Sequence, residues 1–466
     1  MTLVAGVLRG FHLRSPKGLV FDEAYYAQDA CWFLHHSAAT CGIAGETSPM
    51  HPPLAKWLTA FGIWAFGYNE LGWRVAAAVC GTATVAVLYL LARRLTRSTV
   101  GATVAAGLLA VDFLHFVQSR LAMLDVFVTF FSVLAVYFLL LDRDRGGPGA
   151  RWWRYLAGAT AGAAVACKWS GALVLVAMLL LALVWERQQR RRELPSLAVG
   201  LVVLPVVVYT ATFIGVIHHP LLALPWDGHS WWRVFVNRQE YMVRFHSGLE
   251  GTHPYESPPW SWLLDKRPVV YHLERDGSTV REVLALGNPL VWWPCIAAVV
   301  VQAVGWARSR SAMHPGAVIV TIAVVGYVPW LVLAHGREFV FLFYALPTVP
   351  FLCLAAGACA ADIRWHPLGR IALAGAAVAV TASFIFAYPV LANRPLPYDA
   401  FRQRILFTDC GTPGRDGSVV RVRAGTRLMT LPKPGPGKPA GRALRKRPCG
   451  RPSRTRHTGP SRRRSG

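Results

Sequence analysis

The chain has 466 residues, 54% of them hydrophobic, and a mean hydropathy of +0.36. This composition excludes an ordinary soluble enzyme, because the apolar residues form runs of the roughly 20 residues that cross a bilayer as a helix. Such Leu-, Val- and Ala-rich runs predict an all-α integral membrane protein. The formal net charge of +25 comes without a recognisable binding module, so we expect no nucleic-acid partner.

The N-terminal segment 1–17 is too short and too charged to span the membrane, and it does not form a convincing signal peptide. The segment that follows, 18–70, is expected to be the first external loop. Because something should deliver that loop across the membrane, we expect residues 1–17 to be a remnant of a region whose first span is missing.

Two groups of apolar runs follow. The first transmembrane part covers 71–217, the second covers 287–392, and an external loop at 218–286 separates them. The predicted spans are 71–92, 98–117, 122–141, 154–167, 169–185, 196–217, 287–306, 315–333, 338–360 and 369–392.

The connections between these spans alternate in character. If the spans alternate, every arginine cluster falls on one side, which is therefore expected to be cytoplasmic. The other side receives 18–70 and 218–286, which are rich in Trp, Tyr, His and Pro and are expected to carry the chemistry. The clusters are Arg93, Arg94 and Arg97; Arg143, Arg145, Arg151 and Arg154; Arg187, Arg190, Arg191 and Arg192; Arg308 and Arg310; and Arg364 and Arg370.

The C-terminal segment and the cysteines are less informative. Residues 393–466 form a basic tail, rich in Gly, Pro and Arg from residue 411, which is expected to be disordered. Cys31 and Cys41 share the first external loop, where a disulfide between them is a possibility. The nine cysteines show no spacing typical of a metal site, and we expect neither a metal nor a cofactor.

The first external loop contains the series Phe21-Asp22-Glu23-Ala24-Tyr25-Tyr26. Adjacent carboxylates beside a membrane boundary are costly without a function. Neighbouring carboxylates can also be driven apart in pKa, which suits one of them for proton abstraction. A solvated turn that serves solubility is an equally good interpretation of these six residues alone.

The same loop contains His51-Pro52-Pro53-Leu54-Ala55-Lys56-Trp57. Pro53 suits the first turn of a helix, and Lys56 then lies one turn into it. A helix N-terminus with an ammonium group is a candidate phosphate site. A lysine that extends to the interface beside Trp57 explains the motif about as well.

Further ionisable residues lie at the outer ends of predicted spans, where such residues usually face a cavity and mark function. They include Arg74, Arg120, Asp125, Lys168 and Arg337. Asp125 is expected to form a structural ion pair with Arg120. Several cations together with an acidic pair would suit an anionic lipid headgroup and a base that deprotonates an acceptor.

These motifs together resemble one family. The series FDEAYY, HPPLAKW, GWR, HFVQSRLAMLD, CKWSG, HPYESPPWSW, REVLALGNPLVWW and REFVFLFYALPTVPF is similar to the actinobacterial-type branch of the bacterial protein O-mannosyltransferases, from about Gly18 to about Arg404. The resemblance implies a GT-C-type multi-span helical bundle with external loops. It implies inverting transfer of mannose from polyprenyl-phosphate mannose to Ser or Thr of translocated proteins.

The resemblance also implies a location and partners. The enzyme would be a multi-pass protein of the cell membrane with its active site on the extracytoplasmic side. Its partners would be the polyprenyl-phosphate mannose donor, secreted Ser/Thr-containing acceptors and membrane lipid, with the secretion translocon as a further candidate. No cofactor or metal is implied.

Site roles are carried over by the same resemblance. Asp22 would be the catalytic base, and Glu23 would arrange the substrate. Lys56 and Arg74 would contact the lipid phosphate, with Arg120 and Arg337 as further candidates. Such positive charges would stabilise the phosphate as it leaves.

Two other functions fit parts of the pattern. Another GT-C transferase, acting on a lipid or a cell-wall glycan, would share the acidic residue and the HPP motif, but HPYESPPWSW favours a protein acceptor. A transporter fits less well, because no internal repeat is visible and the ionisable residues gather at one face.

Overall fold

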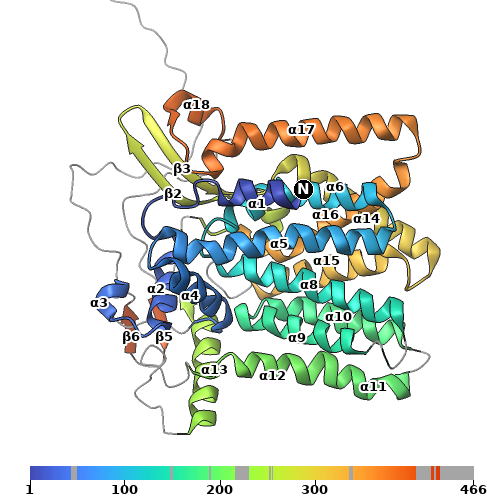
Figure 1. Ribbon diagram of the computed structural model, residues 1–466, viewed down its shortest axis with the longest axis horizontal. Coiled ribbons are helices and arrows are strands. Elements are labelled where there is room, and N and C mark those ends of the chain that lie inside the picture. Colours follow the sequence, from blue (N-terminus) through green and yellow to red (C-terminus); the bar gives the residue numbers. More distant parts are fainter. Residues whose placement is uncertain are drawn as a thin grey trace, which may run out of the picture.

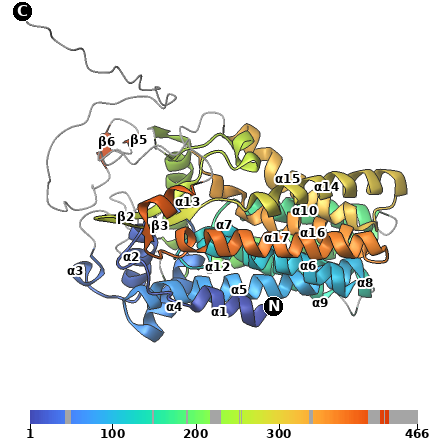
Figure 2. The ribbon, with the colours of Figure 1, turned by 90° about the horizontal axis from the view of Figure 1, so that it is seen from above.

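The spanning helices lie side by side and form a bundle, with smaller elements gathered at one end of it (Figures 1 and 2). The structure is a computed structural model that describes residues 1–42, 50–146, 149, 151–187, 190–215, 230–250, 253, 255–334, 340–405, 421–424 and 427–430.

All ten predicted spans are helical in the residues described. The helices are α5 (Glu70–Thr96), α6 (Thr99–Ala110), α8 (Leu124–Arg145), α9 (Trp152–Cys167), α10 (Gly171–Trp185), α11 (Arg190–Ala198) with a π-helical turn (Val199–Val203) and α12 (Leu204–Ala211), α14 (Pro289–Ser309), α15 (Pro315–Leu333), a 3₁₀ turn η5 (Leu342–Thr348) with α16 (Val349–Ile363), and α17 (Pro367–Leu391). Within the described part of the chain, seven helices are long and apolar enough to cross a membrane. The prediction of a multi-span helical membrane protein is confirmed.

One predicted span is interrupted. The apolar run 98–117 breaks after α6, and a short helix α7 (Phe113–Gln118) begins beyond Asp112. The Asp112 carboxylate accepts a hydrogen bond from the backbone N–H of His115 at 2.8 Å. That side chain caps the N-terminus of α7 and therefore starts a new helix inside the run.

The segments predicted as external loops contain regular structure. The first holds α2 (Glu23–Phe33), α3 (Ala38–Cys41) and α4 (Leu54–Phe66), and the second holds α13 (Trp231–Ser247) and a 3₁₀ turn η4 (Pro259–Leu264). These elements lie at the same end of the bundle, and α13 runs across the direction of the spans in Figure 1. The two predicted loops are therefore partly helical, because these helices have too few apolar positions to resemble a span but enough to bury one face.

The mostly helical structure also contains short strands outside the spans. Strands β2 (Val269–Asp276) and β3 (Thr279–Ala285) form an antiparallel hairpin, which β4 (Leu396–Pro397) extends at the edge of β3. Alternate residues of β2 are buried near its start, as expected for a strand with one face on a core. A second small sheet pairs β1 (Leu249–Glu250), β5 (Arg421–Ala424) and β6 (Arg427–Thr430) in that order.

Both terminal segments are more ordered than expected in the residues described. Residues 1–17 contain helix α1 (Thr2–Gly10), which packs against α5. The predicted disordered tail 393–466 is wrong for residues 393–405, which hold β4 and α18 (Tyr398–Arg402). The backbone N–H of Asn393 donates to the carbonyl of Glu282, so β3 anchors this stretch.

Close backbone contacts join the spanning helices. Helices α6 and α16 approach so closely that a Cβ on Gly357 would lie 2.5 Å from the carbonyl oxygen of Gly101 and 2.8 Å from the Cβ of Ala105. Small residues at such crossings are typical of membrane helix packing, because they let backbones meet. The α6–α16 contact therefore depends on these glycines.

We expect Gly357→Val to destabilise the bundle by about 1–3 kcal/mol, because the added atoms have no room at this crossing. The measurement is thermal unfolding of the purified protein in detergent. Gly375→Val is the matched control, since a Cβ on Gly375 of α17 meets nothing within 4 Å. Equal losses in the two variants would contradict the assigned crossing.

Candidate active site

The two adjacent carboxylates of segment 18–70 have different surroundings. Glu23 is fully buried. Its Oε1 accepts from Arg74 Nε at 2.8 Å and from the N–H of Ala122 at 2.9 Å. Its Oε2 accepts from Arg74 Nη2 at 2.7 Å and from the N–H of Val20 at 3.1 Å. Since a carboxylate offers about four acceptor sites, Glu23 has no capacity left for a substrate.

Arg74 is saturated in the same way. Besides its two bonds to Glu23, it donates from Nη1 to the carbonyls of Leu13 at 3.2 Å and Pro16 at 2.8 Å, and from Nη2 to that of Gly18 at 3.1 Å. All five guanidinium N–H groups are therefore used. A residue that was expected to contact the lipid phosphate instead holds the segment that leads to Asp22.

Arg120 continues this support towards the N-terminus. Its guanidinium donates to the carbonyls of Leu8, Arg9, Phe11 and His12 at 2.7–3.1 Å. Because α1 ends at Gly10, these include carbonyls of the last helical turn that have no partner within the helix. Arg120 thus acts as the C-terminal cap of α1.

The predicted ion pair between Arg120 and Asp125 is wrong. Asp125, in the first turn of α8, instead accepts from Lys168 Nζ at 2.9 and 3.0 Å. Lys168 follows the last residue of α9 in an extended conformation, which directs it into the bundle. Its ammonium group lies 4.1 Å from the ring centroid of Tyr344 in η5, within cation–π range.

Asp22 lies beside this pair. It is only half-buried, at the start of α2, and its Oδ2 accepts from the hydroxyl of Tyr26 at 3.2 Å. Burial raises the pKa of Asp22 to about 6, although the charge of Lys168 and the Tyr26 hydrogen bond act in the opposite direction. A carboxyl group with such a pKa can exchange a proton near neutral pH.

An aromatic wall stands next to Asp22. The ring of Phe21 lies 4.7 Å from that of Tyr271 in β2 and 6.0–6.1 Å from those of His253, Phe341 and Phe343. Burial lowers the pKa of His253 to about 4, so this imidazole is neutral. The wall limits water around Asp22, and a low local dielectric strengthens every charge interaction there.

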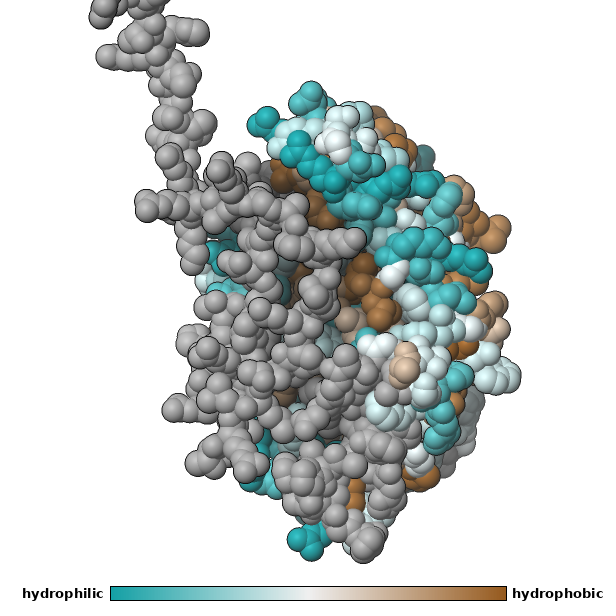
Figure 3. All heavy atoms as spheres, turned by 90° about the vertical axis from the view of Figure 1, so that its left-hand side faces the viewer, coloured by the Kyte–Doolittle hydropathy of each residue, from teal (hydrophilic) through white to brown (hydrophobic). Residues whose placement is uncertain are grey.

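Two histidines follow from Tyr26, the hydrogen-bond partner of Asp22. The ring of His51 lies 5.9 Å from that of Tyr26 and 5.1 Å from that of His246 on α13. His246 also contacts the carbonyl of Met50 at 2.9 Å. Helix α13 therefore borders the site. Figure 3 views this end of the molecule, whose described surface is largely hydrophilic with apolar side chains between.

The remaining predicted phosphate contacts have different outcomes. Lys56 lies in the first turn of α4, as the HPPL motif predicted, but its Nζ forms a buried ion pair with Asp29 of α2 at 2.7 Å. Arg337 lies outside the described residues. A disulfide joins Cys31 and Cys41, with Cα atoms 5.7 Å apart, and helps to hold α2 beside α3. Within the described residues, no group of three His, Cys, Asp or Glu side chains could hold a metal ion.

The sequence predicts Lys168 and Asp125 at the outer ends of spans but does not assign them to the site. The available signal was the lysine of CKWSG inside an apolar stretch. One motif, HFVQSRLAMLD, supplies three supports at once: the Arg120 cap, the Ala122 N–H bound to Glu23, and Asp125. Nothing in its local pattern indicates which partner each group finds.

Family models match most of the chain. Residues 50–211 match the family described as dolichyl-phosphate-mannose-protein mannosyltransferase. Residues 231–409 match the C-terminal four-span region of protein O-mannosyltransferases.

Curated relatives extend over nearly the same length. A polyprenol-phosphate-mannose–protein mannosyltransferase of Mycolicibacterium smegmatis (strain MKD8) is 31% identical, covering 87% of this chain and 90% of that protein. The corresponding Corynebacterium glutamicum protein is also 31% identical, covering 81% and 84%.

Solved structures share the fold. A chain of the S. cerevisiae protein O-mannosyltransferase complex bound to the sugar donor superposes with a TM-score of 0.74 at 14% identity, covering 88% of this chain and 92% of that one. ArnT of Cupriavidus metallidurans bound to undecaprenyl phosphate gives 0.54 at 18% identity, covering 83% and 69%. The GT-C-type bundle is thereby confirmed.

We expect Arg74→Met to destabilise the protein by about 3–5 kcal/mol, because it leaves Glu23 as an uncompensated buried charge. Thermal inactivation in detergent measures this loss. Lys17→Met is the control, since the Lys17–Glu70 pair, 3.7 Å apart, has its lysine side chain 78% exposed and such pairs contribute about 0–1 kcal/mol. A loss in Arg74→Met no larger than in the control would refute the support role.

Proposed function

The chain belongs to the protein O-mannosyltransferase family, and from this premise we propose that it transfers mannose from polyprenyl-phosphate mannose to Ser or Thr hydroxyls of translocated proteins. The observation that carries the proposal is a half-buried Asp22 with a pKa near 6 beside the Lys168–Asp125 pair, in a chain 31% identical to named enzymes of this activity over most of its length. Family membership favours a protein acceptor over the lipid or glycan acceptors of other GT-C transferases.

Asp22 is the general base of this proposal. As the acceptor hydroxyl oxygen forms a bond to C1 of the mannose, its proton passes to Asp22. The bond between C1 and the phosphate oxygen breaks, and polyprenyl phosphate leaves from the opposite face, so the configuration at C1 is inverted. A base with a pKa near the working pH is efficient in such a step.

Cationic support for the leaving phosphate comes from the lysines rather than from the buried arginines. Lys168 shares two hydrogen bonds with Asp125 and still interacts with the charge of Asp22. Lys56 and Arg337 remain candidates for the same role. Glu23, Arg74 and Arg120 act as positioning residues in this proposal, because the hydrogen-bonding groups of Glu23 and Arg74 are used within the protein and Arg120 binds four backbone carbonyls.

Three observations support an active site on the extracytoplasmic side. Asp22 and the smaller elements lie at one end of the bundle, and the arginine clusters lie at the other ends of the same spans. Positively charged connections mark the cytoplasmic side. The Cys31–Cys41 disulfide belongs to the Asp22 end, and disulfides persist in oxidising compartments. Acceptors would reach this face as they leave the secretion translocon.

We expect Asp22→Asn to lower transfer by about 10²–10⁴-fold, the usual contribution of a general base. The assay measures labelled mannose that passes from polyprenyl-phosphate mannose to a Ser/Thr-rich acceptor peptide in membranes. Asp276→Asn, an exposed carboxylate in the β2–β3 hairpin, is the control and should keep full activity. Full activity in Asp22→Asn would remove Asp22 from the base role.

Activity should depend on pH through the same group. Asp22 accepts a proton only when deprotonated, so transfer should be retained above a pH of about 6 and lost as the pH falls through that value. Tyr26→Phe should move this acidic limb to higher pH, because the Tyr26 hydrogen bond lowers the Asp22 pKa. The pH profile of kcat/KM measures both effects. An unchanged limb in Tyr26→Phe would show that another group titrates.

A further inference from the structure

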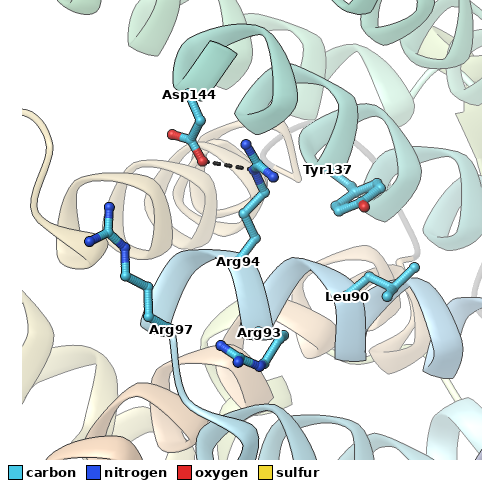
Figure 4. A pocket seen from close by; sticks show the side chains of 6 residues that line it. All are labelled: Leu90, Arg93, Arg94, Arg97, Tyr137 and Asp144. Carbon is cyan, nitrogen blue, oxygen red and sulfur yellow. Dashed lines mark ion pairs between the residues drawn. The ribbon is translucent and has the colours of Figure 1, made fainter.

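A second concave site lies at the end of the bundle opposite Asp22. A cavity of about 570 Å³ opens between α5 and α8 (Figure 4). Arg74, near the start of α5, contacts Glu23, whereas the cavity arginines come from the last turn of α5 and beyond. At 1.5 Å per residue the two sites are about 30 Å apart. The lining residues are Leu90, Arg93, Arg94, Arg97, Tyr137 and Asp144.

The cavity carries excess positive charge. Arg94 pairs with Asp144 at 2.7 Å, between the two helices (Figure 4), and Arg143 binds the same carboxylate at 2.7 Å. Arg93 and Arg97 are exposed. Neither has a carboxylate within ion-pair distance in the part of the chain that the structure describes. Arg94 and Arg143 thus share one carboxylate, and Arg93 and Arg97 add exposed positive charge beside it.

Two lining residues, Leu90 and Tyr137, bring apolar surface to the cavity and are here called its apolar wall. Leu90 lies about one turn before Arg93 and Arg94 on α5, and its side chain is 46% exposed. Tyr137 lies about two turns before Asp144 on α8 and presents a ring with a hydroxyl group. Charged groups thus stand at the helix ends, and an aliphatic and an aromatic side chain stand about 6–10 Å further into the membrane layer.

We propose that this cavity binds an anionic membrane phospholipid, with its phosphate at Arg93 and Arg97 and its glycerol and acyl region against Tyr137 and Leu90. A phospholipid has the same order of groups, with a charged phosphate at the interface and hydrocarbon deeper. Basic pockets between spanning helices are suited to such headgroups. A soluble phosphate would engage the arginines but would make no use of the apolar wall.

A second cavity, between α6 and the start of α17, repeats the pattern. Its volume is about 440 Å³, and it is lined by Val100, Arg364, Trp365, Arg370 and Leu373. The guanidinium group of Arg364 lies 4.4 Å from the ring centroid of Trp365. Arginines, an aromatic ring and aliphatic side chains again line one concave surface, as a bound lipid requires.

The positive-inside distribution alone explains the charge but not the cavity. Arg308 and Arg310, at the end of α14, are exposed arginines of the same face. They line neither of these two cavities. They therefore offer the same charge outside both cavities and provide the control for a specific site.

Lipid binding to the purified, full-length protein in detergent can be measured by native mass spectrometry with phosphatidylglycerol, phosphatidylcholine and soluble glycerol phosphate. We expect phosphatidylglycerol to be preferred, and Arg93→Gln/Arg97→Gln to weaken its binding by about tenfold. Arg308→Gln/Arg310→Gln should change it by less than about twofold. Both variants should retain mannosyl transfer, because neither pair lies in the Asp22 site.

Leu90→Ser tests the apolar wall while every arginine is kept. It should weaken phosphatidylglycerol binding and leave binding of glycerol phosphate unchanged. Equal losses in the two arginine pairs would overturn the proposal in favour of diffuse surface charge. Displacement of phosphatidylglycerol by equimolar glycerol phosphate, or undiminished lipid binding in Leu90→Ser, would overturn the assignment to a lipid.

Discussion

The site depends on the buried Arg74–Glu23 pair and on the carbonyl oxygens that Arg74 and Arg120 bind. The segment from Leu8 to Gly18 is mostly irregular beyond α1, so its buried carbonyls need donors from elsewhere. Two arginines supply them from the bundle. Each guanidinium group is buried, at a desolvation cost that only full hydrogen bonding offsets. Asp22 is therefore placed by charges that never need to meet a substrate.

This arrangement gives two adjacent carboxylates different surroundings. Glu23 begins α2 and faces the bundle, where four donors surround it. Asp22 precedes it and faces the accessible side, where Tyr26 is its one hydrogen-bond donor among the described side chains. Two neighbouring carboxylates thus differ in how many donors they meet, and the four hydrogen bonds of Glu23 fix the backbone next to Asp22.

Sequence reasoning recovered what is local and missed what is long-range. A membrane span can be recognised from a local apolar run of sufficient length, and every predicted span is helical in the structure. Ion-pair partners cannot be recognised from local sequence. Asp125 could have paired with Arg120, five residues away, but instead binds Lys168, 43 residues away. That choice depends on which helix ends pack together. The short external elements were missed because β2–β3 and α13 bury one face without an extended apolar run.

Arginines at both ends of the bundle need hydrogen-bond acceptors, but the acceptors come from different sources. Where arginines are buried, as at Arg74, the protein must provide every acceptor itself, since water is absent. Where they are exposed at the membrane boundary, as at Arg93 and Arg97, the acceptor can come from the surrounding lipid. A lipid bound there would hold α5 against α8 without touching the donor. Helix α5 also carries Arg74, which binds Glu23 next to Asp22. Tighter packing of α5 on α8 would therefore stabilise the position of Asp22 without changing the groups that contact it.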